Sequence, residues 1–199
     1  MSRFIEQAIE RAGLADVIPA RRRGDLAAVR ALVERGGAGE AGAIDLLVLG
    51  ALADLVRRAE NGQVVRVHEV HAPSVLWIDE AASELDLLRA VALARITGAV
   101  GGAVGVDWGR WGLELAQVAL GFGATDLVGP ITQKNGRLIL EEELTKVKGK
   151  GMVARAALKR REIAALVRNA GRECELLDEH GGRVTAGDPP ETAQEALHA

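Results

Sequence analysis

The sequence predicts an α/β protein, and three observations support this class. Segments with helical spacing of apolar residues alternate with short strand-like segments from Ile44 to Leu177, a pattern typical of α/β or α+β folds. The strand-like segments are rich in valine, which favours strands, or in glycine, which permits close approach of backbones. Hydrophobic residues make up 48% of the 199 residues, so a single domain with a small extension can bury a real core.

Three helices are predicted in an N-terminal helical segment that spans residues 1–62. They cover residues 4–12, 26–34 and 44–60, and glycine follows each of them closely. The third has an apolar face at helical spacing, and Asn61-Gly62 ends it with residues that tolerate a positive φ.

The next segments begin the predicted sheet. Residues 63–70 contain four valines in a short run and are predicted as a strand. Residues 72–79 contain a proline and are predicted as a loop. Ser83 followed by Asp86 resembles a capping box, which predicts a helix that runs to about residue 96.

A glycine-rich apolar strand is expected at residues 100–106, and a buried helix, apolar on nearly all sides, at residues 113–122. Residues 127–132 and 137–140 are predicted to pair as a hairpin across Asn135-Gly136, a strong turn dipeptide.

The last predicted elements are a helix at residues 160–170 and a short strand at residues 174–177. The composition from residue 181 onward is typical of a disordered tail. The chain thus divides into the N-terminal helical segment (1–62), an α/β domain (63–180) and a tail (181–199).

Several segments, taken in order, resemble one enzyme family. Val106-Asp107-Trp108 leads to a run from Ala116 to Leu127 that ends Phe-Gly-Ala-Thr-Asp-Leu, and helices at residues 45–53, 86–96 and 160–172 have the family's pattern. The family is the radical S-adenosylmethionine enzymes of futalosine-dependent menaquinone synthesis, namely aminofutalosine synthase and cyclic dehypoxanthinyl futalosine synthase, with the related deazaflavin-cofactor enzymes. The resemblance implies a partial (β/α) barrel-like sheet of about 4–6 strands, since a closed barrel needs on the order of 200–250 residues.

The chain departs from this family where the family's chemistry lies. Those enzymes hold an iron–sulfur cluster with three closely spaced cysteines, whereas this chain has a single cysteine, Cys174. One thiol cannot supply three cluster ligands. We therefore expect no cofactor and no radical chemistry, and we expect Cys174 to be a bystander.

Four residues are candidates for acid–base catalysis: His68, His71, Asp107 and Asp126. The two histidines are the only cluster of metal-capable side chains, but their odd spacing puts them on opposite faces of a strand unless the chain bends at Pro73. The alternative is a strand-end surface role, and we expect no metal site. Asp107 follows a predicted strand, where parallel sheets bind ligands.

Three residues are candidates for ligand binding. Trp108 matches the family's tryptophan, the resemblance places Asp126 near the family's substrate cavity, and Arg110 is specific to this chain. The alternatives are an Asp107–Arg110 surface pair beside a tryptophan that caps the sheet edge, and a backbone-capping turn at Asp126.

The charge pattern bears on partners and location. A net charge of −3 gives no general attraction to nucleic acid. Residues 134–172 hold eleven Lys and Arg against four Asp and Glu, but no aromatic residue lies among them, so we expect a solvated basic face rather than a nucleic-acid site. We expect a cytoplasmic protein that does not enter membranes, because no signal core or long apolar run is present.

A half-barrel leaves two open edges and an uncovered face, which favour association. We therefore expect a homodimer, or a heteromer with a full-length barrel enzyme, and a small-molecule ligand. The leading interpretation is a degenerate radical-SAM-like protein with an accessory, regulatory or ligand-binding role in menaquinone synthesis. The alternatives are a small α/β enzyme with acid–base chemistry and a structural interaction module.

Overall fold

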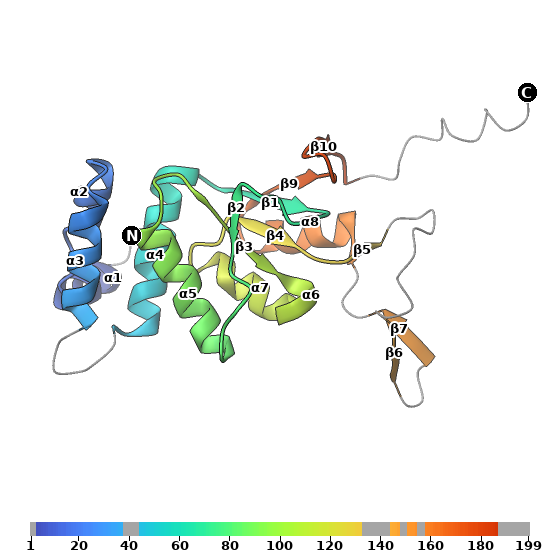
Figure 1. Ribbon diagram of the computed structural model, residues 1–199, viewed down its shortest axis with the longest axis horizontal. Coiled ribbons are helices and arrows are strands. Elements are labelled where there is room, and N and C mark those ends of the chain that lie inside the picture. Colours follow the sequence, from blue (N-terminus) through green and yellow to red (C-terminus); the bar gives the residue numbers. More distant parts are fainter. Residues whose placement is uncertain (1–2, 38–43, 133–143, 148–150, 155–157, 187–199) are drawn as a thin grey trace, which may run out of the picture.

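The computed structural model describes residues 3–37, 44–132, 144–147, 151–154 and 158–186 (Figure 1). The helices are α1 (Arg3–Arg11), α2 (Val17–Arg22), α3 (Leu26–Gly37), α4 (Leu46–Asn61), α5 (Glu84–Thr97), α6 (Trp108–Trp111), α7 (Leu113–Leu120) and α8 (Arg160–Asn169). The strands are β1 (Val64–His68), β2 (Val75–Trp77), β3 (Ala103–Asp107), β4 (Asp126–Val128), β5 (Ile131–Thr132), β6 (Leu144–Val147), β7 (Gly151–Ala154), β8 (Leu158–Lys159), β9 (Glu173–Leu177) and β10 (Arg183–Val184).

The α/β class is confirmed by a six-stranded sheet that does not close on itself. Its strand order is β10-β9-β1-β4-β3-β2, and every neighbouring pair is parallel except β10 with β9. The connections through α5, through α6 and α7, and through α8 all move the chain in one direction along the sheet. Right-handed crossovers therefore put α5, α7 and α8 on the same face, as in part of a barrel.

The strand register separates the two faces of this sheet. Buried aliphatic side chains share the face that packs on the helices: Val65, Val67, Val104, Val106, Leu127 and Leu176. We call the opposite side the polar face, because it carries Arg66, His68, Trp77, Asp107, Asp126 and Glu175. The connection from β1 to β2 returns past two intervening strands and places His71 and Trp77 beside His68 on this face.

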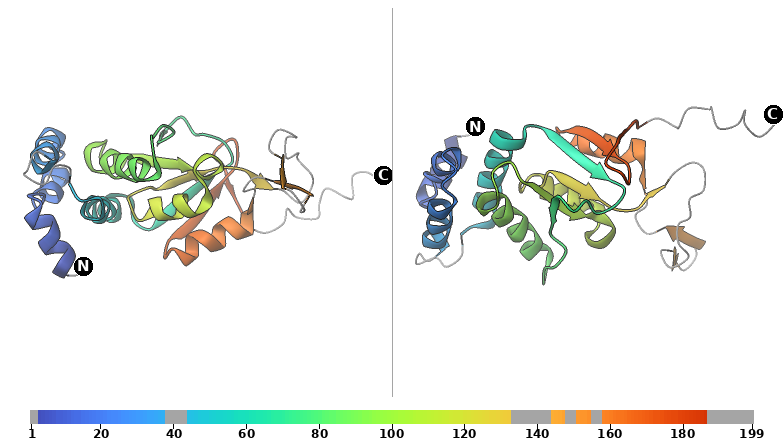
Figure 2. Two further views of the ribbon diagram at one scale, coloured as in Figure 1. Left: turned by 90° about the horizontal axis from the view of Figure 1, so that it is seen from below. Right: turned by 45° about the horizontal axis from the view of Figure 1, so that its top comes forward.

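Helices α1, α2 and α3 form a layer at one end of the molecule, next to α4 and α5 (Figures 1 and 2). Helix α2 was not predicted from the sequence, and it contains Pro19. Pro19 lies in the first turn of α2, where a missing N–H costs nothing, and Val17 and Ala20 bury the inner side of this helix.

The start of α5 is confirmed as predicted: the Ser83 hydroxyl accepts a hydrogen bond from the Asp86 N–H at 3.2 Å. The predicted loop at residues 72–79 is wrong in its centre, where β2 forms a three-residue edge strand beside β3. Pro73 stays outside this strand, so it removes no ladder hydrogen bond.

Two further predictions differ from the structure. Residues 131–132, predicted in a hairpin, pair in parallel with Leu158–Lys159, while residues 137–140 lie outside the described residues. The sheet also continues past residue 181, because Arg183–Val184 pairs with β9, and residues 187–199 lie outside the described part. Within the described residues, no helix combines the length and apolar character that a membrane crossing requires.

Candidate functional site

The central feature of the polar face is a buried histidine–aspartate pair. His68 ends β1 and Asp126 begins β4, and these strands are neighbours in the middle of the sheet. The His68 Nε2 lies 2.7 Å from the Asp126 Oδ1. Asp126 is 0% exposed and His68 is 6% exposed, so this pair is shielded from bulk water.

The second oxygen of Asp126 is held by its neighbour Thr125. The Thr125 hydroxyl lies 2.6 Å from Asp126 Oδ2 and accepts a hydrogen bond from Arg95 Nη2 at 3.1 Å. Asp126 is therefore linked to a buried cation through one hydroxyl group.

Helix α5 delivers Arg95 to this position. Its guanidinium also donates to the carbonyls of Gly123 and Gly102 and to Asn61 Oδ1. Burial lowers the pKa of Arg95 to about 10, although the charges of Glu60 and Asp126 act to raise it. Arg95 is still a cation at neutral pH.

Trp77 brings the two histidines together. Its ring contacts His68 and His71 edge-on, with ring centroids 5.6 and 4.9 Å apart. Its indole N–H donates to the Ala72 carbonyl at 3.0 Å. The alternation of a strand does not separate the histidines, because β1 ends at His68 and the chain bends before His71.

Asp107 lies near His71 and also begins a helix. Its Oδ2 lies 3.8 Å from His71 Nε2, and Asp79 lies at the same distance from that nitrogen. Its Oδ1 accepts the Gly109 N–H at 2.7 Å and caps α6. The structure therefore groups the four candidate acid–base residues into two His–Asp pairs around one tryptophan.

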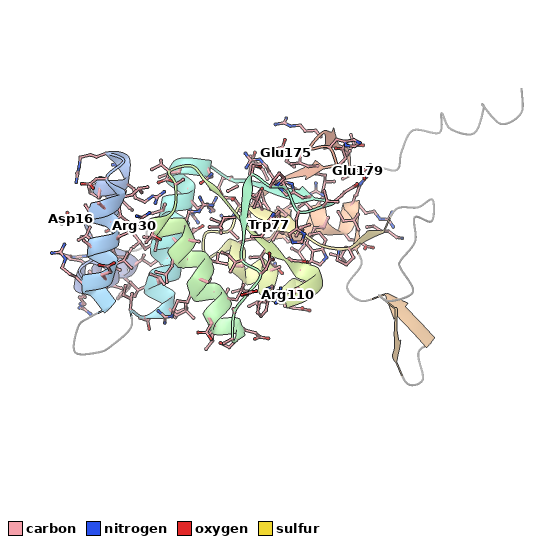
Figure 3. All side chains as sticks on the ribbon, viewed as in Figure 1. Asp16, Arg30, Trp77, Arg110, Glu175 and Glu179 are labelled. Carbon is pink, nitrogen blue, oxygen red and sulfur yellow. The ribbon has the colours of Figure 1, made fainter. Side chains whose placement is uncertain are left out.

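The other two ligand-binding candidates, Trp108 and Arg110, belong to α6, the helix that Asp107 caps. Trp108 is fully buried in the core, packed against the backbone at Gly129. Arg110 is exposed, with its guanidinium 5.7 Å from the centre of the Trp111 ring (Figure 3). Asp126 is fully buried, whereas a capping turn at the surface would leave its carboxylate exposed.

Two pockets lie elsewhere on the described surface. One of about 370 Å³ lies beside β9 and β10 and includes Cys174, and another of about 440 Å³ lies between α2, α4 and the turn before β3. Neither is lined by His68 or Asp126. Among the described residues, no group of three or more His, Cys, Asp or Glu is arranged to hold a metal ion.

No protein-family model matches the chain, and no curated protein is significantly similar to it in sequence. The likeness to radical enzymes therefore rests on the residues quoted above.

Sequence reasoning did not find Arg95, Thr125 or Trp77 as parts of the site. A signal for Arg95 was present, because it follows Leu88, Val91 and Ala92 on the buried stripe of α5. A charged residue on such a stripe needs partners inside the protein. Trp77 gave no comparable signal, since its three-residue strand is too short to show periodicity.

Proposed function

We propose that this protein binds a small polar ligand on the polar face of its sheet, with His68 and Asp126 at the centre of the site. The observation that carries the proposal is the 2.7 Å contact between these two buried groups on central parallel strands. Burying a charge is costly, and apolar residues of similar volume would often serve stability as well. A buried histidine–carboxylate pair is therefore more typical of a functional site than of a core.

The resemblance to the radical enzymes supports a narrower form of this proposal. Asp126 belongs to the segment that resembles that family, and it is one member of the buried pair. In this form the protein is a degenerate radical-SAM-like relative that binds a futalosine-like nucleoside and acts as an accessory protein in menaquinone synthesis. With one cysteine in the chain, it binds without radical chemistry.

Calorimetry with the wild type and two histidine variants tests this proposal. The probes are futalosine, inosine and adenosine. His68→Gln removes the imidazole from the site, whereas the control His180→Gln changes a side chain that is 84% exposed. We expect saturable 1:1 binding of at least one probe, weakened about two- to tenfold by His68→Gln, since a hydrogen bond between neutral groups contributes about 0.5–1.5 kcal/mol.

Equal affinity in both variants would contradict the central role of His68. Failure of all three nucleosides would contradict the narrower form.

A second candidate is acid–base catalysis, which is favoured by the second pair formed by His71 and Asp107. Imidazole and carboxylate side chains are the groups most often used for proton transfer. Chromatography of the probe after incubation separates the two functions, because a binding protein returns it unchanged and an enzyme converts it.

We also propose that the protein associates with a second copy or with a barrel enzyme. The open sheet supports this, because its edge strands β2 and β10 each have one side without a neighbouring strand in the sheet. Light scattering during size exclusion would give a dimer mass, and a stable monomer at micromolar concentration without a barrel partner would oppose self-association.

A further inference from the structure

The hydrogen bonds of Thr125 have a direction that can be assigned from its partners. Its hydroxyl oxygen lies 3.1 Å from Arg95 Nη2 and 3.1 Å from the Val104 backbone nitrogen. Both partners can only donate, so together they occupy the two lone pairs of the hydroxyl. Its single proton then points to Asp126 Oδ2 at 2.6 Å, in preference to the Val104 carbonyl at 3.4 Å.

This direction determines the role of the next two groups. A carboxylate at Asp126 offsets the buried charge of Arg95, and Oδ2 accepts the Thr125 proton. A carboxylate can only accept hydrogen bonds. The His68 Nε2 at 2.7 Å from Oδ1 must therefore donate.

We propose that Arg95 and Thr125 are positioning residues that select the tautomer of His68, so that the neutral form of the ring carries its proton on Nε2. The Nδ1 atom is then the hydrogen-bond acceptor and base of the site. This inference deepens the proposed function and rests on it for the ligand: the group that meets His68 carries a proton to share, as a hydroxyl or an N–H does.

The proposal differs from a structural role for the same residues. Arg95 and Thr125 also hold α5 against the turn before β4, and their loss would lower stability in either case. Only the positioning role requires a particular tautomer of His68, because it depends on the direction of each hydrogen bond from Arg95 through Thr125 and Asp126 to His68. The position of the imidazole proton is therefore the decisive measurement.

The first experiment uses the wild-type protein labelled with ¹⁵N-histidine. Long-range ¹H–¹⁵N spectra distinguish protonated from unprotonated ring nitrogens roughly two pH units above the ordinary histidine pKa of about 6.5. The chain has four histidines, so signals of His68 are assigned by substituting His71, His180 and His198 with glutamine. We expect the His68 proton on Nε2, and a proton on Nδ1 instead would overturn the proposal.

The second experiment reverses the direction of the hydrogen bond between residue 126 and His68 with the substitution Asp126→Asn. The Thr125 proton holds the amide oxygen on its side, so the amide NH₂ faces His68 and Nε2 must accept. We expect the His68 proton to shift from Nε2 to Nδ1. Adding Thr125→Ser retains a hydroxyl and the shift, whereas adding the isosteric Thr125→Val frees the amide to turn and the shift is lost.

Two results would overturn the inference: a folded Asp126→Asn variant that keeps the proton on Nε2, or identical spectra with Thr125→Ser and Thr125→Val. Circular dichroism checks the fold of each variant, and if Asp126→Asn does not fold, the wild-type tautomer decides alone. Titrating futalosine, inosine and adenosine into the labelled wild type tests the proposed function separately. If the tautomer is the expected one and no probe shifts the His68 signals, the narrower, nucleoside-binding form of that function is contradicted and the positioning role is left intact.

Discussion

Arg95 occupies a position on α5 where the surrounding pattern favours an apolar side chain. It is 1% exposed, and its guanidinium has acceptors in three other parts of the chain, at Asn61, at Gly102 and in the turn that holds Gly123 and Thr125. Buried charges persist where they are fully paired, and this one ends a chain of contacts that leads to His68. A residue that breaks the local pattern thus marks the neighbourhood of the candidate site.

Cys174 is a contrasting residue whose environment suppresses reactivity. Burial on β9 raises its pKa from 9.0 to about 11, while the charge of Arg168 acts weakly in the opposite direction. A pKa raised by two units lowers the thiolate fraction about a hundredfold at pH 8. We expect iodoacetamide to label the native protein about a hundredfold more slowly than the urea-unfolded chain.

The pH profile separates this effect from simple shielding. The labelling rate of native Cys174 should rise about tenfold per pH unit from pH 8 and level off only near pH 11. Because the folded pKa is raised, stability from the buried thiol is complete below pH 9 and is lost as pH rises towards 11. A plateau near pH 9 would contradict the assignment.

At the scale of elements, β2 depends on a glycine in its neighbour. Trp77 packs on Gly105 of β3, and a Cβ atom there would lie 2.3 Å from the indole ring and 2.8 Å from Val75. The glycine thus makes room for the tryptophan that contacts both histidines.

Gly105→Ala should destabilise the protein by about 1–3 kcal/mol, because the added methyl overpacks a filled space. It should also displace Trp77 from His68. Urea unfolding followed by far-UV circular dichroism measures the first effect, and the His68 ring signals measure the second.

Gly37→Ala is the matched control, since a Cβ at this position meets nothing within 4 Å and its φ is not positive. We expect no loss of stability in this variant. Equal unfolding curves for the two substitutions would show that the packing of Trp77 on β3 contributes little.

For the whole molecule, Arg21 connects the N-terminal helices to the sheet domain. All five of its N–H groups have acceptors: both oxygens of Glu60 on α4, and three carbonyls at residues 96, 98 and 99. Burial alone would raise the pKa of Glu60, but hydrogen bonds from Arg21 and the Gly101 N–H lower it, together with the charges of Arg21 and Arg95. The N-terminal helical segment is therefore joined to the sheet domain by a fully hydrogen-bonded buried arginine.

Arg21→Leu should lower the free energy of unfolding by about 3–5 kcal/mol at pH 7, because it leaves Glu60 without its arginine partner. It also takes a hydrogen-bond donor from three carbonyls, although the Ala99 carbonyl still accepts the Gly102 N–H. Glu60 has a lowered folded pKa, so the stability from its ionised form is present above the ordinary value of 4.5 and is lost as pH falls through the folded value. The loss of unfolding free energy caused by Arg21→Leu should therefore be smaller at pH 3 than at pH 7. Arg22→Leu changes an exposed neighbour and should leave stability nearly unchanged at both values, as urea unfolding can show.

The fold was largely predictable from local pattern, and the site only in part. Valine-rich β1, the cap of α5 and the presence of α7 follow from residues close together in the chain. The prediction that α7 is buried on nearly all sides was wrong, because Val118 is 48% exposed. His68 and Asp126 were named as candidates from a histidine cluster and a family resemblance, without any reason to join them. Thr125 was not a candidate, because a threonine before a strand is unremarkable until its partners are known.

Residue types and their spacing were enough to predict an α/β protein, because helix periodicity, caps and strand propensity act over a few neighbouring positions, whereas the open sheet was expected from the family resemblance and the chain length. The contact between His68 and Asp126 joins residues 58 positions apart and exists only because β4 lies beside β1. Strand order and register depend on how all helices pack on the sheet together. Only the tertiary structure therefore decided that His68, Asp126 and Arg95 belong to one hydrogen-bonded network.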